Sequence, residues 1–266
     1  MTDAYTKKVK LFQILNVIGF ILTIVVNGLA NTIPLNGKTT GEISDSYPNL
    51  FAPAGITFAI WGVIYFALGL FVIYQLGFFS KGKKEYVDVV SSIGWSFFIA
   101  SLANAGWIFA WHYEKIFISV VIMLILLISL IDIYEKVNTN SGDSIIEKIT
   151  VQWPFSIYLS WISVATIANI TAFLVSINWD GFGIAPATWT MILILVATII
   201  TLKFVFYKKD APYAFVTLWA FLGILIKHLT FFGGQYKGII IITLFSMVII
   251  FASIFAMPKA YQTERN

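Results

Sequence analysis

Residues 116–134 read IFISVVIMLILLISLIDIY, a run of apolar side chains in which Asp132 alone carries a charge. A helix that crosses the roughly 30 Å hydrocarbon core of a membrane needs about 20 such residues. Seven other stretches have the same character, and the full set is 11–30, 53–77, 91–111, 116–134, 155–177, 188–207, 214–232 and 238–257. Because a helix satisfies its own backbone hydrogen bonds in lipid, the sequence predicts an all-α polytopic membrane protein with eight transmembrane helices.

Charged residues make up only 11% of the chain and lie mostly between these stretches. If the N-terminus is cytoplasmic, thirteen of the 17 Lys and Arg residues fall on the cytoplasmic side. Membrane proteins concentrate basic residues there. We therefore expect a multi-pass protein of the plasma membrane with both termini in the cytoplasm. The net charge of +4 then reflects basic loops beside lipid headgroups, and no nucleic-acid partner is expected.

The chain offers little material for catalysis or for binding a metal. It has no cysteine, which excludes thiolate chemistry and disulfides. Its two histidines, His112 and His228, are far apart in the sequence and make no convincing metal cluster. No glycine-rich phosphate loop follows a strand. We therefore expect no catalytic residues and no metal ligands.

Aromatic and amide side chains recur at helical spacing in three of the stretches. These residues are Trp61 and Tyr65 in the second stretch, Asn104 and Trp107 in the third, and Tyr158, Trp161, Ala165 and Asn169 in the fifth. Residues at such spacings share one helix face. Three such faces together would form a pocket with apolar walls and a few hydrogen-bonding groups, as is typical of small-molecule sites. Plain packing, with the asparagines bonding across helices, is the alternative.

Other polar and aromatic residues have simpler interpretations. Five tryptophans near the ends of the stretches are expected to anchor at the membrane interface: Trp95, Trp111, Trp153, Trp179 and Trp189. Lys227 and His228 lie inside the seventh stretch, where charge is costly and normally faces an interior or a water-filled space. They are therefore candidates for ion or proton coupling, and snorkelling of the lysine to the interface is the alternative.

The aromatic motifs resemble those of the TspO/MBR family, the tryptophan-rich sensory proteins. The matching residues are Pro53, Trp61, Gly62, Tyr65 and Gly69 in the second stretch, Leu102, Asn104 and Trp107 in the third, and Tyr158, Trp161, Ala165 and Asn169 in the fifth. The resemblance implies a five-helix bundle over residues 1–177, with the loop 31–52 covering a ligand pocket. Residues 178–266 would then add three transmembrane helices and a short cytoplasmic tail.

The resemblance also implies a ligand and a partner. The pocket of this family takes flat or bulky apolar molecules, so we expect a tetrapyrrole such as a porphyrin as the first candidate ligand, and a homodimer. Sterols are not expected, because residues 170–182 read ITAFLVSINWDGF and lack the Tyr and basic residue of the family's sterol motif. The leading hypothesis is a receptor or carrier that binds a small apolar or amphipathic ligand.

Two alternatives come from other functional classes. The first is a secondary transporter of a small solute that uses Lys227 and His228, although the eight stretches show no clear repeated halves. The second is an enzyme that acts on a lipid-soluble ligand with the help of the pocket tryptophans. Membrane lipids are expected neighbours under all three hypotheses.

Overall fold

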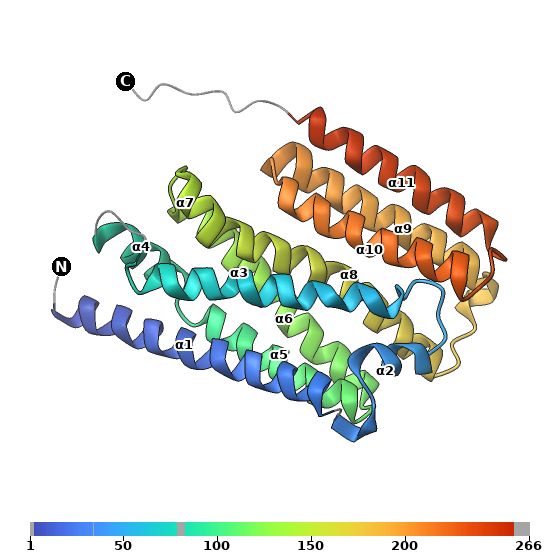
Figure 1. Cartoon of the computed structure of the whole chain (residues 1–266), viewed down its shortest axis with the longest axis horizontal. Helices are drawn as coiled ribbons and strands as arrows, with labels where there is room; N and C mark the ends of the chain where they lie inside the picture. Colours follow the sequence, from blue (N-terminus) through green and yellow to red (C-terminus); the bar gives the residue numbers. More distant parts are fainter. Residues whose placement is uncertain (1–2, 34, 79–82, 258–266) are drawn as a thin grey trace.

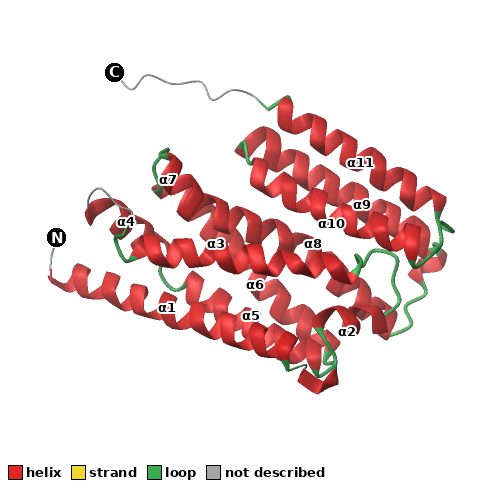
Figure 2. Ribbon diagram, viewed as in Figure 1, coloured by secondary structure: helices red, strands yellow, loops and turns green. Residues whose placement is uncertain are grey.

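The computed structural model describes residues 3–33, 35–78 and 83–257, and these contain helices and no strand (Figure 2). Seven helical runs in them are long and apolar enough to cross a membrane: Tyr5–Thr32, Gly55–Gln75, Ile116–Asn140, Ile145–Ser176, Pro186–Lys208, Ala211–Thr230 and Lys237–Phe255. A bent pair, Tyr86–Ile93 and Ser96–His112, makes the eighth if it is counted as one span. The predicted all-α membrane fold is therefore confirmed, and each predicted stretch corresponds to one run or to the bent pair.

The α-helices are α1 (Asp3–Thr32), α2 (Thr40–Ser46), α3 (Ile60–Gln75), α4 (Lys83–Ile93), α5 (Ser96–His112), α6 (Ile116–Asn140), α7 (Ile145–Glu147), α8 (Trp153–Ser176), α9 (Pro186–Lys203), α10 (Ala211–Thr230) and α11 (Lys237–Phe255). Short 3₁₀ turns lie at η1 (Leu35–Gly37), η2 (Gly55–Ala59) and η4 (Gly181–Gly183). Two segments with π-type hydrogen bonding, η3 (Lys148–Gln152) and η5 (Phe204–Lys208), extend α8 at its start and α9 at its end.

The third predicted stretch differs most from the structure. The stretch 91–111 is not one straight helix, because α4 and α5 meet at an angle of 56°. Gly94 lies at the break with a φ of +58°, a left-handed conformation that glycine adopts without steric cost. Hydropathy reports how apolar a segment is and not its direction, so the bend was not predicted.

The helices form two groups that lie side by side (Figure 1). The first holds α1, α3, α5, α6 and α8, and the second holds α9, α10 and α11, with α10 packed against α8. Helix α1 begins and α11 ends at the same end of the molecule, as an even number of spans requires (Figure 1). Helix α2 lies across the opposite end. The division at residue 177 into a bundle and an addition stays a prediction.

A buried carboxylate joins the two groups at the end opposite α2. Asp210 is the N-cap of α10, and its side chain accepts hydrogen bonds from the Tyr213 amide, from the Ser156 hydroxyl at 2.6 Å and from the Tyr134 hydroxyl at 2.8 Å. These partners belong to α10, α8 and α6. Burial raises the pKa of Asp210 above its ordinary value, and the hydrogen bonds oppose that rise. The joint is fully satisfied, so we assign it a structural role.

Candidate aromatic ligand site

Trp61 on α3 is the centre of an aromatic cluster between α3, α5 and α8. Its ring stacks on Tyr65 with a centroid distance of 5.5 Å. Trp107, Tyr158 and Trp161 approach the same ring at centroid distances of 6.4, 5.9 and 6.1 Å. The predicted faces of three different helices therefore meet, and all of these rings except that of Tyr65 belong to buried residues. We call these five residues the aromatic cage.

An amide network lies on one side of the aromatic cage. Asn104 on α5 is fully buried and donates a hydrogen bond of 2.8 Å to the hydroxyl of Tyr158. It accepts a hydrogen bond of 2.6 Å from Asn27 on α1, whose amide also donates to the Thr23 carbonyl. Asn104 thus links α1, α5 and α8, which matches the cross-helix bonding that the sequence left open.

The second predicted asparagine makes a similar link. Asn169 on α8 accepts a hydrogen bond of 2.9 Å from the indole N–H of Trp107 and donates one of 2.9 Å to the Ser119 hydroxyl on α6. The Trp107 indole N–H is therefore already satisfied. Ala165, one turn before Asn169, lines the cavity described next, and its small side chain leaves space there beside α8.

A small cavity of about 30 Å³ lies beside the cage rings. It is lined by Ser44, Pro53, Phe58, Trp61, Trp107, Trp111, Trp161, Val164, Ala165, Ala168 and Asn169. Two buried polar atoms of this site have no hydrogen-bond partner among the described residues, the indole N–H of Trp161 and the hydroxyl of Tyr65. Because an unsatisfied buried donor costs about 1–3 kcal/mol, the Trp161 N–H marks a place where an acceptor is missing.

Helix α2 forms the roof of the cavity through Ser44. The helix is held by a capping box, in which the Thr39 side chain accepts from the Glu42 amide and the Glu42 carboxylate accepts from the Thr39 amide. Its underside is buried, and His112 accepts a hydrogen bond from the Thr40 hydroxyl with Nε2 while Nδ1 donates to the Leu35 carbonyl. The expected covering loop is thus an ordered element that closes the cavity.

Trp111 corrects one prediction made from sequence position. It was expected to anchor at the membrane interface, but only 4% of its surface is exposed. Its ring stacks on Trp107 at a centroid distance of 5.7 Å, and its N–H donates to the Thr40 carbonyl. The covering loop buries it, which position within the predicted span did not indicate.

Exposed charges hold the covering loop to the turn between α5 and α6. Glu114 in this turn accepts hydrogen bonds from Lys38 at 3.2 Å and from the Tyr47 hydroxyl at 3.1 Å. The Lys38 ammonium, and after it the Tyr47 hydroxyl, hold the pKa of Glu114 below its ordinary value of 4.5. Burial, and after it the same carboxylate, raises the pKa of Tyr47.

Lys227 and His228 lie at the covering loop and away from the cage. Lys227 pairs with Asp45 of α2, with 2.7 Å between Nζ and Oδ1. His228 donates from Nε2 to the Leu50 carbonyl at 2.9 Å. The cavity that the cage lines does not include either residue. Their role in ion or proton coupling stays a prediction, and what the structure adds is a contact between α10 and the loop.

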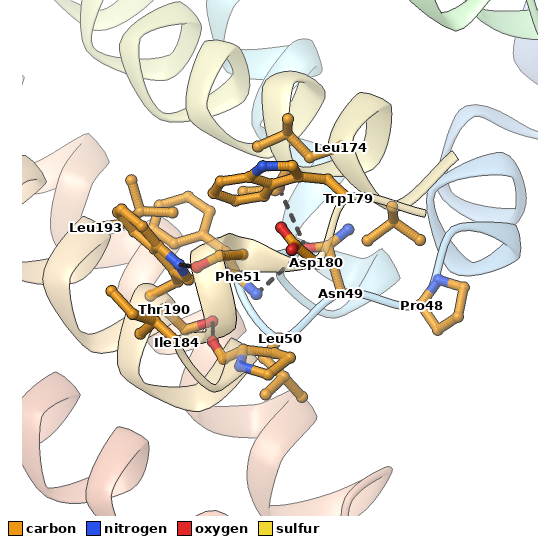
Figure 3. Close-up of a pocket in the computed structure, with 15 residues that line it drawn as sticks. Pro48, Asn49, Leu50, Phe51, Leu174, Trp179, Asp180, Ile184, Thr190 and Leu193 are labelled. Atoms are coloured by element: carbon orange, nitrogen blue, oxygen red, sulfur yellow. Dashed lines mark hydrogen bonds between the residues drawn. The ribbon is translucent and has the colours of Figure 1, made fainter. Parts of the chain in front are cut away.

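A second, larger pocket of about 180 Å³ lies on the other side of the loop (Figure 3). Residues 48–51 of the loop form one wall, and the end of α8, η4 and the start of α9 form the others, with Trp179 and Asp180 beside Asn49. Its polar groups are used internally, because Asn49 accepts from the Phe51 and Ala52 amides and Trp189 donates to the Gly181 carbonyl. Among the described residues, no buried donor without a partner lines this pocket, so we favour the smaller cavity as the candidate site.

Three polar residues of the site were missed in the sequence. Asn27, Ser44 and Ser119 come from the first stretch, the loop and the fourth stretch, and none belongs to an aromatic face. Asn27 is in principle detectable, since an amide inside an apolar stretch requires a partner. Ser44 and Ser119 are too ordinary to identify without the fold.

The fold and the site define a polytopic helical membrane protein with an aromatic cage closed by an ordered loop. The family model described as TSPO-like protein matches residues 13–256, and the chain belongs to this family. The matched region covers α9, α10 and α11 completely, as well as the first five spans apart from the start of the first. No curated protein matches the chain, and no solved structure does.

Proposed function

We propose that this protein binds a flat apolar or amphipathic ligand in the aromatic cage, as a receptor or carrier, with a tetrapyrrole as the first candidate. The observation that carries the proposal is the buried, unpartnered N–H of Trp161 at a cavity walled by other indole rings. Aromatic walls stack on planar molecules, and a lone donor selects a ligand that brings an acceptor. Porphyrins such as protoporphyrin IX offer both a planar ring and, in their propionate groups, acceptor oxygens.

The cavity is too small to hold such a ligand unless the site opens. A volume of about 30 Å³ holds no more than about two water molecules, whereas ligand pockets usually measure roughly 300–1,000 Å³. A planar ligand therefore needs the covering loop to lift and cage rings to turn aside. Beside the roof formed by α2, the exposed ion pair between Lys38 and Glu114 is a contact of the covering loop that breaks at moderate cost.

Protoporphyrin IX quenching of tryptophan fluorescence tests the proposal in purified protein. We expect saturable quenching in the wild type and weaker binding in Trp161→Ala, which loses both a wall and the donor. Absence of saturable quenching in the wild type by protoporphyrin and by the smaller ligands below would remove the proposal.

A pair of matched ligands isolates the hydrogen bond. Fluorenone and fluorene share a flat three-ring frame, and only the ketone carries an acceptor. Trp161→Phe should weaken fluorenone binding about fivefold more than fluorene binding, the effect of one hydrogen bond of about 1 kcal/mol. Trp107→Phe is the control, because the Trp107 N–H is already used by Asn169 and both ligands should be affected alike. Equal losses for the two ligands in Trp161→Phe would show that the donor is not used.

A further inference from the structure

One face of α10 contacts residues 45–57, the segment that runs from the roof of the cage in α2 to η2. Trp219, Gly223 and Lys227 are spaced by four residues and so lie on one helix face. The Trp219 indole donates to the Thr57 carbonyl at 2.9 Å, and the Gly223 carbonyl accepts from the Ala54 amide at 3.0 Å. Lys227 completes the row through its ion pair with the carboxylate of Asp45. We call this row of contacts the α10 seam.

The backbone at Gly223 brings the two segments into direct contact. A Cβ atom at this position would overlap the Thr57 side chain and would meet Pro53 at 2.9 Å. Such close approach requires glycine and fixes α10 against η2 and the residues before it. The position of Lys227, one turn further along, is therefore set by a rigid contact and not by the flexible lysine alone.

The ion pair at the end of the seam has one buried partner. The Lys227 side chain is 8% exposed, whereas that of Asp45 is 51% exposed. An ammonium group buried to this degree depends on its partner, because an unpaired charge there is strongly disfavoured. Asp45 directly follows Ser44, the residue that roofs the cavity. Movement of the roof away from the cage therefore separates this pair.

We propose that α10 is a clamp that holds the roof of the aromatic cage closed, with Lys227 and Asp45 as its positioning residues. Helix α10 belongs to the last three helices, so these helices set how often the cage opens. His228 strengthens the clamp through Leu50, the next loop segment along. The clamp controls access to the aromatic cage, so its biological role rests on the proposed function, but it can be tested without a ligand.

Hydrogen exchange of the loop amides in the full-length protein tests the clamp. In ligand-free protein in lipid nanodiscs, Lys227→Met should speed exchange of residues 40–47 about tenfold, as expected when a partly buried ion pair is lost. Lys237→Met is the matched control, because Lys237 is an exposed lysine at the same end of the molecule and should leave these amides unchanged. Amides in the middle of α8 report whether each variant is folded.

A double-mutant cycle with Asp45→Asn makes the result specific to the pair. Asp45→Asn should also speed exchange in the loop, and the Lys227→Met/Asp45→Asn variant should exceed the single variants by much less than the product of their effects. Unchanged exchange in both single variants, or fully multiplicative effects, would overturn the clamp. Failure of every ligand to bind would remove the proposed function and leave this result standing.

Discussion

The contrast between Gly223 and Gly62 shows how much one atom matters in this molecule. A Cβ atom at Gly223 would overlap Thr57, whereas one at Gly62 would meet nothing within 4 Å. Gly223→Ala should therefore lower the free energy of unfolding by about 1–3 kcal/mol through overpacking. Gly62→Ala should raise it by up to about 1 kcal/mol through helix propensity. Thermal unfolding in mild detergent measures both, and equal stability of the two variants would contradict the packing at η2.

A second prediction for a single residue concerns Asn104 and the stability of the fold. Asn104→Ala removes the partner of Asn27 and of Tyr158, so the free energy of unfolding should fall by about 1–2 kcal/mol. Asn31→Ala serves as the control, since Asn31 is exposed on α1 and donates only to the Asn27 carbonyl. The same unfolding measurement checks it. A loss in Asn104→Ala no larger than that in Asn31→Ala would mean that the buried amide network contributes no net stability.

The sequence revealed the cage residues because their chemistry is unusual for lipid. Trp61, Trp107 and Trp161 share helix faces with amides, and the structure places their rings together. Their hydrogen bonds were not predictable, since donors such as that of Trp107 find partners on other helices. Among the described residues, the buried indole N–H of Trp161 has no hydrogen-bond partner, which is a property of the assembled packing and has no signature in the sequence. Whether the cage binds a ligand stays a prediction.

The covering loop is the element on which access to the cage depends. Lys38 and Tyr47 hydrogen-bond the Glu114 carboxylate and lower its pKa, so the charged form of Glu114 stabilises the closed loop. This contribution is complete above the ordinary pKa of 4.5 and is lost as the pH falls through the lower value of the folded state. We therefore expect the loop amides, after correction for intrinsic exchange rates, to lose protection below about pH 4.5.

Glu114→Gln assigns this effect to its residue. The variant should show reduced loop protection at neutral pH and a smaller further loss on acidification. The comparison is needed because Glu42 in α2 also has a lowered pKa, mainly through the Thr39 backbone amide and then through the Thr39 side chain. The stabilising contribution of charged Glu42 is therefore also lost as the pH falls. Identical pH profiles in wild type and variant would place the response in the capping box of α2 and not at Glu114.

The helices themselves were largely predictable, and their joints were not. The predicted stretch 214–232 and the observed α10 (Ala211–Thr230) differ by two or three residues at each end. The length of an apolar segment depends only on its own residues, so such boundaries can be predicted from the sequence. The break at Gly94 between α4 and α5 depends on how α4 packs against α1 and α6, which no local pattern records.

At the scale of the whole molecule, the absence of cysteine allows a direct test of topology. The sequence predicts that the turn before α11 is external and that the turn after α6 is cytoplasmic. In intact cells, Gln235→Cys should react with a membrane-impermeant maleimide, and Asp143→Cys should react only after permeabilisation. Both positions are exposed and each variant has a single thiol. The opposite pattern would mean that the chain is inserted the other way round.

The arrangement of the two helix groups was the least predictable feature. The sequence indicated three further spans, but their role could not be predicted because their side chains are mostly apolar. Lys227 and His228 stood out, yet their partners, Asp45 and the Leu50 carbonyl, lie about 180 residues earlier in the chain. A pairing over such a distance follows from the packing of α10 beside the first group and not from any local pattern.

This long separation has a consequence for biosynthesis. Asp45 leaves the ribosome 182 residues before Lys227. At a translation rate of about 5–20 residues per second, roughly 9–36 s pass between the two events. Trp161, the last ring of the cage to be made, precedes Lys227 by 66 residues, so for roughly the last 3–13 s of that interval the nascent chain contains every ring of the cage while the helix that secures its cover is still incomplete. Under the proposed clamp, the newborn protein therefore passes through a stage in which the cage residues are present but the ion pair between Asp45 and Lys227 cannot yet form.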